Sequence, residues 1–288
     1  MDNKKSLSKS DEFRDLLADY IHGASELVRR LFTQIAHASG SSDTVLKDLG
    51  QARELLRRAH PEMVSLSMAV TLILKRVEKG ADVETASREL ELSWNANMKR
   101  VTEMAAKYLA GHHRVLTISY SGLVRDAILK AKAQSCTPEV YLGEGRPKYE
   151  GLALARELAD EGVPCTVFAD SAFAGFINDV DCVLIGADAI CASFLLNKIG
   201  TTAILREARA RDVPTAVAYD CLKVTEDAEF SDLIMDYPAD ELLMGPSAQR
   251  AFGSNAGSSQ CSSCLQVVNR YFETIPRSLL DVELADSF

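Results

Sequence analysis

Short β-rich runs alternate with helical stretches from residue 112 to residue 219, and this alternation constrains the fold more than any other feature. The β-rich runs cover residues 115–118, 140–142, 165–169, 183–185 and 215–219. The helical stretches cover residues 123–133, 149–160, 171–178 and 196–211. Such alternation is typical of βα units in a parallel sheet, and right-handed crossovers place helices on both faces. The second half is therefore predicted to be a doubly wound, mostly parallel α/β domain.

The first 110 residues show no strand signal and a helical repeat of apolar residues. The repeat predicts helices over residues 11–35, 43–59, 64–79 and 83–109, with Asp11 as a cap for the first. The polar residues 1–10 are expected to form a disordered tail. The domains are thus a helical domain, residues 11–111, and the α/β domain, residues 112–288. Within the latter, we expect a flexible loop over residues 245–263 and a last strand over residues 265–272.

Charge and hydropathy exclude several classes of function. A net charge of −9 argues against a large nucleic-acid-binding surface. No apolar run approaches the roughly 20 residues that span a bilayer, and the polar N-terminus is not typical of a signal peptide. We therefore expect a cytoplasmic protein without a direct nucleic-acid or membrane partner.

Seven cysteines are present, and most lie in apolar, strand-like surroundings that are typical of reduced thiols. Cys261 and Cys264 form a CxxC pair without the second pair that a structural zinc site requires. No metal or other cofactor is therefore expected.

Polar side chains follow the predicted strands, where parallel α/β sheets bind their ligands. Asp188 comes directly after a buried strand and a glycine, which suits a general base or a partner for sugar hydroxyls. Ser121 precedes a helix whose N–H groups would bind phosphate, and Arg146 and Lys198 would add cationic donors. We expect Asn197 and Lys198 at the start of a helix. Together these residues predict a site for a phosphorylated sugar.

Each residue also has a purely structural interpretation. Ser121 would be a helix cap, and Arg146 would form a surface ion pair. Asn197 and Lys198 would be a solvated helix start, and Asp188 would serve the turn alone. The sequence has no GxGxxG after the first strand, no P-loop and no GxSxG, which argues against a nucleotide-dependent dehydrogenase, an NTPase and an α/β-hydrolase.

Three segments, GEGRPKYEG (143–151), GADAI (186–190) and NKIGT (197–201), carry a family resemblance. The chain resembles the family of translation initiation factor 2B alpha, beta and delta subunits, which also contains methylthioribose-1-phosphate isomerase and ribose-1,5-bisphosphate isomerase. The resemblance runs from HGASEL (22–27) to NRYFETIP (269–276). It implies a helical N-terminal domain, a Rossmann-like C-terminal domain and a homodimer or higher homo-oligomer.

The resemblance also implies a catalytic pair, which in the isomerases is a cysteine after the first strand and the aspartate of the GAD motif. Asp188 matches the aspartate, whereas Ser119 stands where the cysteine would be. A serine hydroxyl is far less acidic than a thiol and is a poor substitute for proton delivery. The catalytic pair implied for this chain is therefore incomplete.

The phosphate positions of the family are partly kept. Ser121, Arg146, Asn197 and Lys198 match them. The Arg-Gly-Ala of the isomerases reads His22-Gly23-Ala24 here, and their Ala-Arg-Pro reads Ala59-His60-Pro61. Two permanent cations have thus become histidines, which are mostly neutral at pH 7 unless an anion raises their pKa. As a structural alternative, His22 would lie on a helix face without a ligand, and His60 would cap or pack.

Three functions follow. The first is an initiation factor 2B alpha-like protein that binds a phosphorylated sugar or nucleotide in a regulatory role, with a translation factor as a possible partner. The alternative is an aldose-1-phosphate to ketose-1-phosphate isomerase with altered catalytic residues, in which Asp188 and Ser119 would act. The third is a scaffold without a ligand, which would leave Arg146, Asn197 and Lys198 unused.

Overall fold

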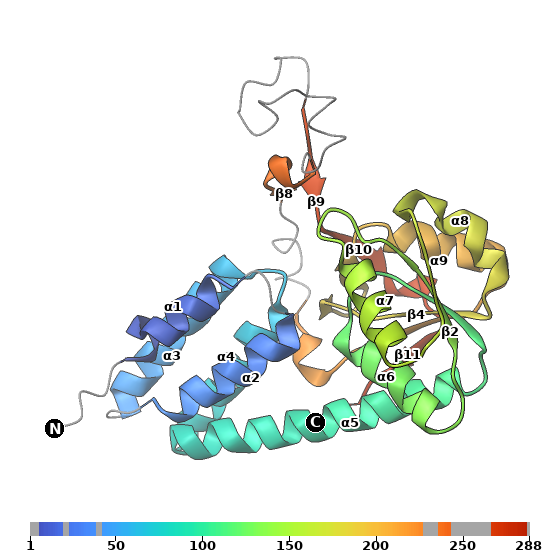
Figure 1. The fold of residues 1–288 in the computed structure, drawn as a ribbon. Coiled ribbons are helices and arrows are strands. Elements are labelled where there is room, and N and C mark those ends of the chain that lie inside the picture. Colours follow the sequence, from blue (N-terminus) through green and yellow to red (C-terminus); the bar gives the residue numbers. More distant parts are fainter. Residues whose placement is uncertain (1–5, 20–22, 39–41, 227–235, 243–265, 287–288) are drawn as a thin grey trace.

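The computed structural model describes residues 6–19, 23–38, 42–226, 236–242 and 266–286, and Figure 1 shows a group of helices beside an α/β sheet domain. The N-terminal helices are α1 (Asp11–Leu17), α2 (Ala24–Ala36), α3 (Ser42–Ala59), α4 (Val64–Glu78) and α5 (Val83–Leu109). The helices predicted over residues 43–59, 64–79 and 83–109 are therefore confirmed.

The prediction of a single helix over residues 11–35 is wrong. The segment holds two helices, α1 and α2, and Gly23 is the extended residue that precedes α2. The apolar repeat did not reveal the break because both helices bury their apolar faces in the same core, as Leu16 and Leu27 show. Ser10, rather than Asp11, caps α1 by accepting a hydrogen bond from the Phe13 N–H.

Part of the predicted disordered tail is ordered. Leu7–Lys9 forms a 3₁₀ turn, and Leu7 is buried against the helical core. The Asp48 carboxylate accepts hydrogen bonds from the N–H groups of Leu7 and Ser8 and from the Ser6 hydroxyl. A carboxylate on α3 therefore holds this turn, which composition alone could not reveal.

The second half is built on a six-stranded parallel sheet. The strand order across the sheet is β11-β7-β4-β1-β2-β3. When these six strands are numbered 1 to 6 in chain order and read from the β3 edge, the order is 3-2-1-4-5-6, which is the Rossmann order. The strands are β1 (Arg114–Thr117), β2 (Glu139–Gly143), β3 (Cys165–Phe168), β4 (Cys182–Ile185), β7 (Thr215–Ala218) and β11 (Val282–Leu284). The predicted doubly wound α/β domain is confirmed, with β11 as a sixth strand that the sequence did not predict.

Alternating strand residues divide the core into two faces. On one face, Val115, Cys182 and Leu184 pack with α5, α6 (Gly122–Ala133) and α7 (Glu150–Asp160). On the other, Leu116 and Val183 pack with α8 (Phe173–Phe176) and α9 (Thr201–Ala210). Successive side chains of a strand point to opposite faces of the sheet. A parallel strand that is buried on both faces therefore requires apolar residues at all of these positions.

A three-stranded antiparallel sheet corrects a second prediction. Residues 196–200 were expected to begin a helix, but Asn197 and Lys198 belong to β6 (Phe194–Lys198). This strand pairs with β5 (Ala189–Ile190) and β10 (Phe272–Pro276). The helix α9 begins only at Thr201, after Gly200 at φ 100°. The partner strand of Asn197 and Lys198 is β10, which lies more than 70 residues later in the chain, so local periodicity could not show this pairing.

The C-terminal part differs from expectation for the same reason. The strand predicted over residues 265–272 is shifted, because β9 (Asn269–Arg270) pairs with β8 (Asp236–Tyr237) and ETIP lies inside β10. The whole of the expected loop 245–263, and likewise Cys264, lies outside the described residues.

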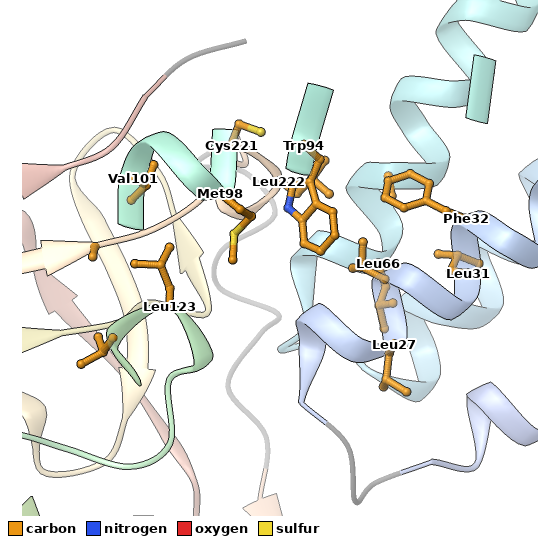
Figure 2. Close-up of a cluster of buried hydrophobic side chains, with 14 of the residues drawn as sticks. Leu27, Leu31, Phe32, Leu66, Trp94, Met98, Val101, Leu123, Cys221 and Leu222 are labelled. Atoms are coloured by element: carbon orange, nitrogen blue, oxygen red, sulfur yellow. The ribbon is translucent and has the colours of Figure 1, made fainter. Parts of the chain in front are cut away.

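One helix joins the two halves. The helix α5 runs from the N-terminal helices to the sheet (Figure 1), and its residues enter a core shared by both. At the joint, the Trp94 ring lies 5.9 Å from that of Phe32, and its Nε1–H donates to Asp220 Oδ1 at 2.9 Å. Figure 2 shows Leu66, Met98 and Leu222 around this tryptophan. The predicted boundary at residue 111 separates the helical half from the sheet, but one hydrophobic core continues across it.

The described residues show neither a membrane-spanning helix nor a cluster of metal-binding side chains. None of their helices is long and apolar enough to cross a membrane. They also contain no group of three or more His, Cys, Asp or Glu side chains arranged for a metal ion.

Candidate functional site

The candidate site lies at the point in the sheet where the connections on either side run in opposite directions. The central strands β1 and β4 are neighbours, while the chain leaves β1 towards β2 and returns to β4 from β3. The loops after these two strands carry Ser119, Ser121 and Asp188. Such a crevice, at the carboxyl ends of the strands, is where doubly wound sheets bind ligands.

Gly186 lets the two loops approach one another. A Cβ atom at this position would lie 2.6 Å from Ser121 Oγ, closer than ordinary contact allows. A glycine is therefore required, and the GAD loop lies directly against the start of α6. The polar residues after the first and fourth predicted strands were expected to lie at one edge of the sheet, and this close approach brings the two loops together there.

Asp188 is the central carboxylate. Its backbone N–H donates to the Leu196 carbonyl at 2.8 Å, which ties the GAD loop to β6. Its side chain keeps 27% of its surface exposed, and Lys223 Nζ lies 3.9 Å from Oδ1. Burial raises the pKa of Asp188 even though Lys223 and Lys198 oppose the shift. A carboxyl group held near lysines and still easier to protonate is suited to proton transfer.

Lys198 lies deep in the site rather than at a solvated helix start. Only 4% of its side chain is exposed, and its Nζ forms a 2.7 Å ion pair with Glu150 Oε1. The ammonium also lies 4.7 Å from the centre of the Tyr271 ring. Asn197 is buried beside it, and its Nδ2 donates to Thr201 Oγ1. The two residues are thus brought together, but by a strand.

Arg146 lines a cavity of about 370 Å³ with Lys198, Ser171 and Arg270. Its guanidinium donates to the Tyr149 hydroxyl at 2.6 Å and to the Leu242 carbonyl at 2.8 Å. Among the described residues it has no acidic partner, so the ion-pair interpretation finds no support there. Lys198 and Arg270 are paired with Glu150 and Asp236, so Arg146 is the cation of this lining that most favours an anionic ligand.

The two serines differ in role. Ser121 Oγ accepts a hydrogen bond from the Val124 N–H, so it is the helix cap that the structural interpretation expected. Ser119 lies in the left-handed region at φ 63°, which is uncommon for a residue with a side chain and often marks a functional position.

The N-terminal candidates are less well supported. His22 lies outside the described residues, Gly23 precedes α2, and Ala24 is its first residue. His60 is 1% exposed, and its Nε2 lies 3.2 Å from the Leu16 carbonyl oxygen. Burial lowers the pKa of His60, so the ring is neutral at pH 7. The structure therefore favours packing for His60 over binding of a phosphate.

Sequence reasoning missed three charged residues of the site. Glu62, on the loop between α3 and α4, is buried, and the charge of Asp188 acts on its pKa. Lys223, in the turn after β7, is also buried and faces Asp188. Lys148, in the GEGRPKYEG segment, lies 4.8 Å from the Tyr271 ring centre. Lys223 and Lys148 both follow strands and could have been found there, but nothing local marks Glu62.

Asp170 and Asp220 also follow strands, and they support the loops. Asp170 accepts hydrogen bonds from the N–H groups of Gly145 and Arg146. Asp220 accepts from the Leu222 N–H as well as from Trp94. These two carboxylates hold the backbone of their loops in place. Asp188 differs from them because its carboxylate faces lysine side chains.

Comparisons with known proteins agree with this architecture. The ribose 1,5-bisphosphate isomerase of Archaeoglobus fulgidus is 28% identical over 275 residues, which cover 92% of this chain and 84% of that protein. The crystal structure of Pyrococcus horikoshii OT3 translation initiation factor eIF-2B has a TM-score of 0.77 and 20% identity, covering 96% of this chain and 94% of that one. The 5-methylthioribose 1-phosphate isomerase of the same organism has a TM-score of 0.73 and 19% identity, covering 97% and 83%.

The two structural likenesses, at these identities, show the fold alone. A family model, however, matches residues 21–287, which is nearly the whole chain, and its description is the Initiation factor 2 subunit family. The chain belongs to the Initiation factor 2 subunit family.

Proposed function

We propose that this protein is an isomerase that converts an aldose 1-phosphate into a ketose 1-phosphate. The observation that carries the proposal is Asp188, an acid at the sheet's ligand-binding edge whose pKa is raised while Lys223 and Lys198 lie beside it. The 28% identity to a ribose 1,5-bisphosphate isomerase over most of both chains supports it. This reverses the order of our sequence-based hypotheses, which put regulation first.

The reaction has requirements that the site meets. The ring oxygen must gain a proton as its bond to C1 breaks. The C2 hydrogen then moves to C1 with its electron pair, and the C2 hydroxyl loses its proton to a base. Asp188 is the base, and the cationic cluster of Arg146, Lys198 and Arg270, which line the cavity, binds the phosphate.

Substrate NMR tests this function. Purified protein is incubated with ribose 1-phosphate, ribose 1,5-bisphosphate or methylthioribose 1-phosphate, and ketose formation is followed by ¹³C and ³¹P spectra. We expect turnover of at least one of them and a loss of about 10²- to 10⁴-fold in Asp188→Asn. Asp160→Asn, an exposed carboxyl at the end of α7, is the matched control and should retain full activity. Unchanged spectra with all three compounds would exclude the isomerase.

Ser119 favours a second candidate function, a regulatory protein that binds a phosphorylated sugar or nucleotide. A serine where the resemblance places a cysteine removes a proton donor without removing the cationic cluster. In this case ribose 1-phosphate, ribose 1,5-bisphosphate or AMP would raise the melting temperature without being converted. Such a protein would act in the cytoplasm as a homodimer, with a translation factor as its partner. Light scattering and co-purification would test those two assemblies.

A further inference from the structure

We propose that Glu62 is the proton donor of this site and that it acts with Asp188 as a pair of carboxyl groups. This inference rests on the proposed isomerase function. Glu62 would protonate the ring oxygen of the bound aldose 1-phosphate while Asp188 accepts the proton of the C2 hydroxyl.

Packing of α4 brings Glu62 to the site. Val64, at the first position of α4, belongs to a small apolar cluster with Ala189 and Leu196. Ala189 is the residue after Asp188, and the Leu196 carbonyl accepts the Asp188 N–H. Glu62 is two residues before Val64. The loop from the helical half therefore lies against the GAD loop, and the site is built from both halves of the chain.

Glu62 is buried and lacks a firm partner. It is 5% exposed, and its Oε2 has no hydrogen-bond partner among the described residues. The Tyr237 hydroxyl lies beside this carboxyl group and acts on its pKa as a hydrogen-bond donor, although the hydroxyl and Oε2 do not meet in hydrogen-bond geometry. Buried polar atoms are nearly always satisfied, and an unsatisfied carboxyl oxygen is costly. The Glu62 carboxyl group is therefore suited to a bound ligand that forms the missing hydrogen bond with Oε2.

The charges around the pair separate the two roles. Burial raises the pKa of Glu62, and the charge of Asp188 raises it further, whereas Tyr237 and Lys148 oppose the shift. Asp188 has Lys223 and Lys198 beside it, and the charge of Glu150 acts against them. The charge of Asp188 disfavours ionisation of Glu62, and neighbouring carboxyl groups that are coupled in this way titrate as a pair. Two lysines favour ionised Asp188, whereas at Glu62 the charge that opposes burial comes from Lys148 alone, so we assign the proton of the pair to Glu62.

Other groups in the described part of the site are weaker donors. The Ser119 hydroxyl is far too weakly acidic. Burial raises the pKa of the Tyr237 phenol beyond its ordinary value. Glu150 is engaged in an ion pair with Lys198, and His60 is directed to the Leu16 carbonyl. Glu62, a buried carboxyl group with a raised pKa and an Oε2 without a hydrogen-bond partner among the described residues, is thus the proton donor that we assign.

The step balances in protons and electrons. The Glu62 proton is transferred to the ring oxygen as the bond from that oxygen to C1 breaks. The C2 hydrogen and its electron pair move to C1, and the C2 hydroxyl proton passes to Asp188. One proton leaves Glu62 and one arrives at Asp188, so proton exchange between the two carboxyl groups, directly or through water, restores the resting state. No oxidant, metal or cofactor is consumed.

Steady-state kinetics of the full chain test the proposal, with the three sugar phosphates named above as substrates. We expect Glu62→Gln to lower kcat by about 100-fold or more, because general-acid catalysis contributes that much. KM should change less than threefold. Glu62→Asp, which keeps the acid but shortens it, should retain part of the activity. Glu54→Gln, an exposed carboxylate on α3, is the matched control and should equal the wild type.

The pH profile gives a second readout. Wild-type kcat should fall at high pH as Glu62 loses its proton, and this limb should be absent from the residual activity of Glu62→Gln. A wild type that converts none of the substrates would overturn both the proposed function and this inference. An active wild type without the high-pH limb, or a Glu62→Gln enzyme with unchanged kcat, would overturn this inference alone. A raised KM at constant kcat would reduce Glu62 to a binding residue and would also contradict it.

Discussion

A single carboxyl group, Glu62, illustrates how much of this site depends on burial rather than on local sequence. The residue follows a histidine and a proline between two helices, a place where a glutamate is ordinarily solvated. Here it is buried beside Asp188, and desolvation changes its chemistry. Its contribution to stability should therefore depend on pH in a direction opposite to that of a salt-bridged carboxylate.

The pKa of folded Glu62 is raised, so the folded state binds its proton more tightly than the unfolded state does. Stability from this group is present below the unfolded pKa, about 4.3, and is lost as the pH rises through the folded pKa. Glu62→Gln cannot ionise and escapes this loss. We expect the variant to melt at a higher temperature than the wild type at pH 8, with the difference shrinking towards pH 4. Calorimetry at several pH values measures it, and a wild type that is more stable at pH 8 would contradict the raised pKa.

At the scale of elements, the sequence predicted those helices and strands that show a regular local pattern of apolar residues. The helices over residues 43–59, 64–79 and 83–109 and the five strands 115–219 are confirmed, because each buries a regular apolar face. Asn197 and Lys198 were assigned to a helix because the pairing of β6 with β10 comes from another part of the chain. Glu62 was missed for the same reason, since its neighbours are brought by packing. Asp188 and Lys198 could be predicted as candidate site residues because they follow or flank a strand at the ligand-binding edge.

The junction of β10 with α9 offers a prediction at this scale. Gly200 precedes α9 without a side chain to cap it, and the Thr202 N–H instead donates to Glu273 Oε1 at 2.8 Å. Glu273→Ala should lower the free energy of unfolding by about 1 kcal/mol, the usual effect of losing a helix cap. Glu273→Gln keeps an acceptor oxygen and should lose less. Urea unfolding measures both, and an unaffected Glu273→Ala protein would show that water replaces the cap.

For the whole molecule, the two halves form one structure that places the site at their joint. The core runs from the helical half through α5 to one face of the sheet, and Trp94 lies within it. The indole also donates to Asp220, which holds the turn that carries Lys223. Loss of the helical half would therefore expose apolar sheet residues and displace both Glu62 and Lys223 from Asp188. The site depends on cooperative folding of both halves.

Trp94 is the one tryptophan of the chain, so its fluorescence reports on this joint. Because one core spans both halves, we expect urea to unfold them together. The fluorescence transition should then coincide in midpoint with loss of helical circular dichroism and with loss of activity. Two separate transitions, with the fluorescence change preceding the loss of sheet and helix signals, would show that the helical half detaches first. In that case the approach of Glu62 to Asp188 would be a property of a docked state, and activity should follow the fluorescence transition alone.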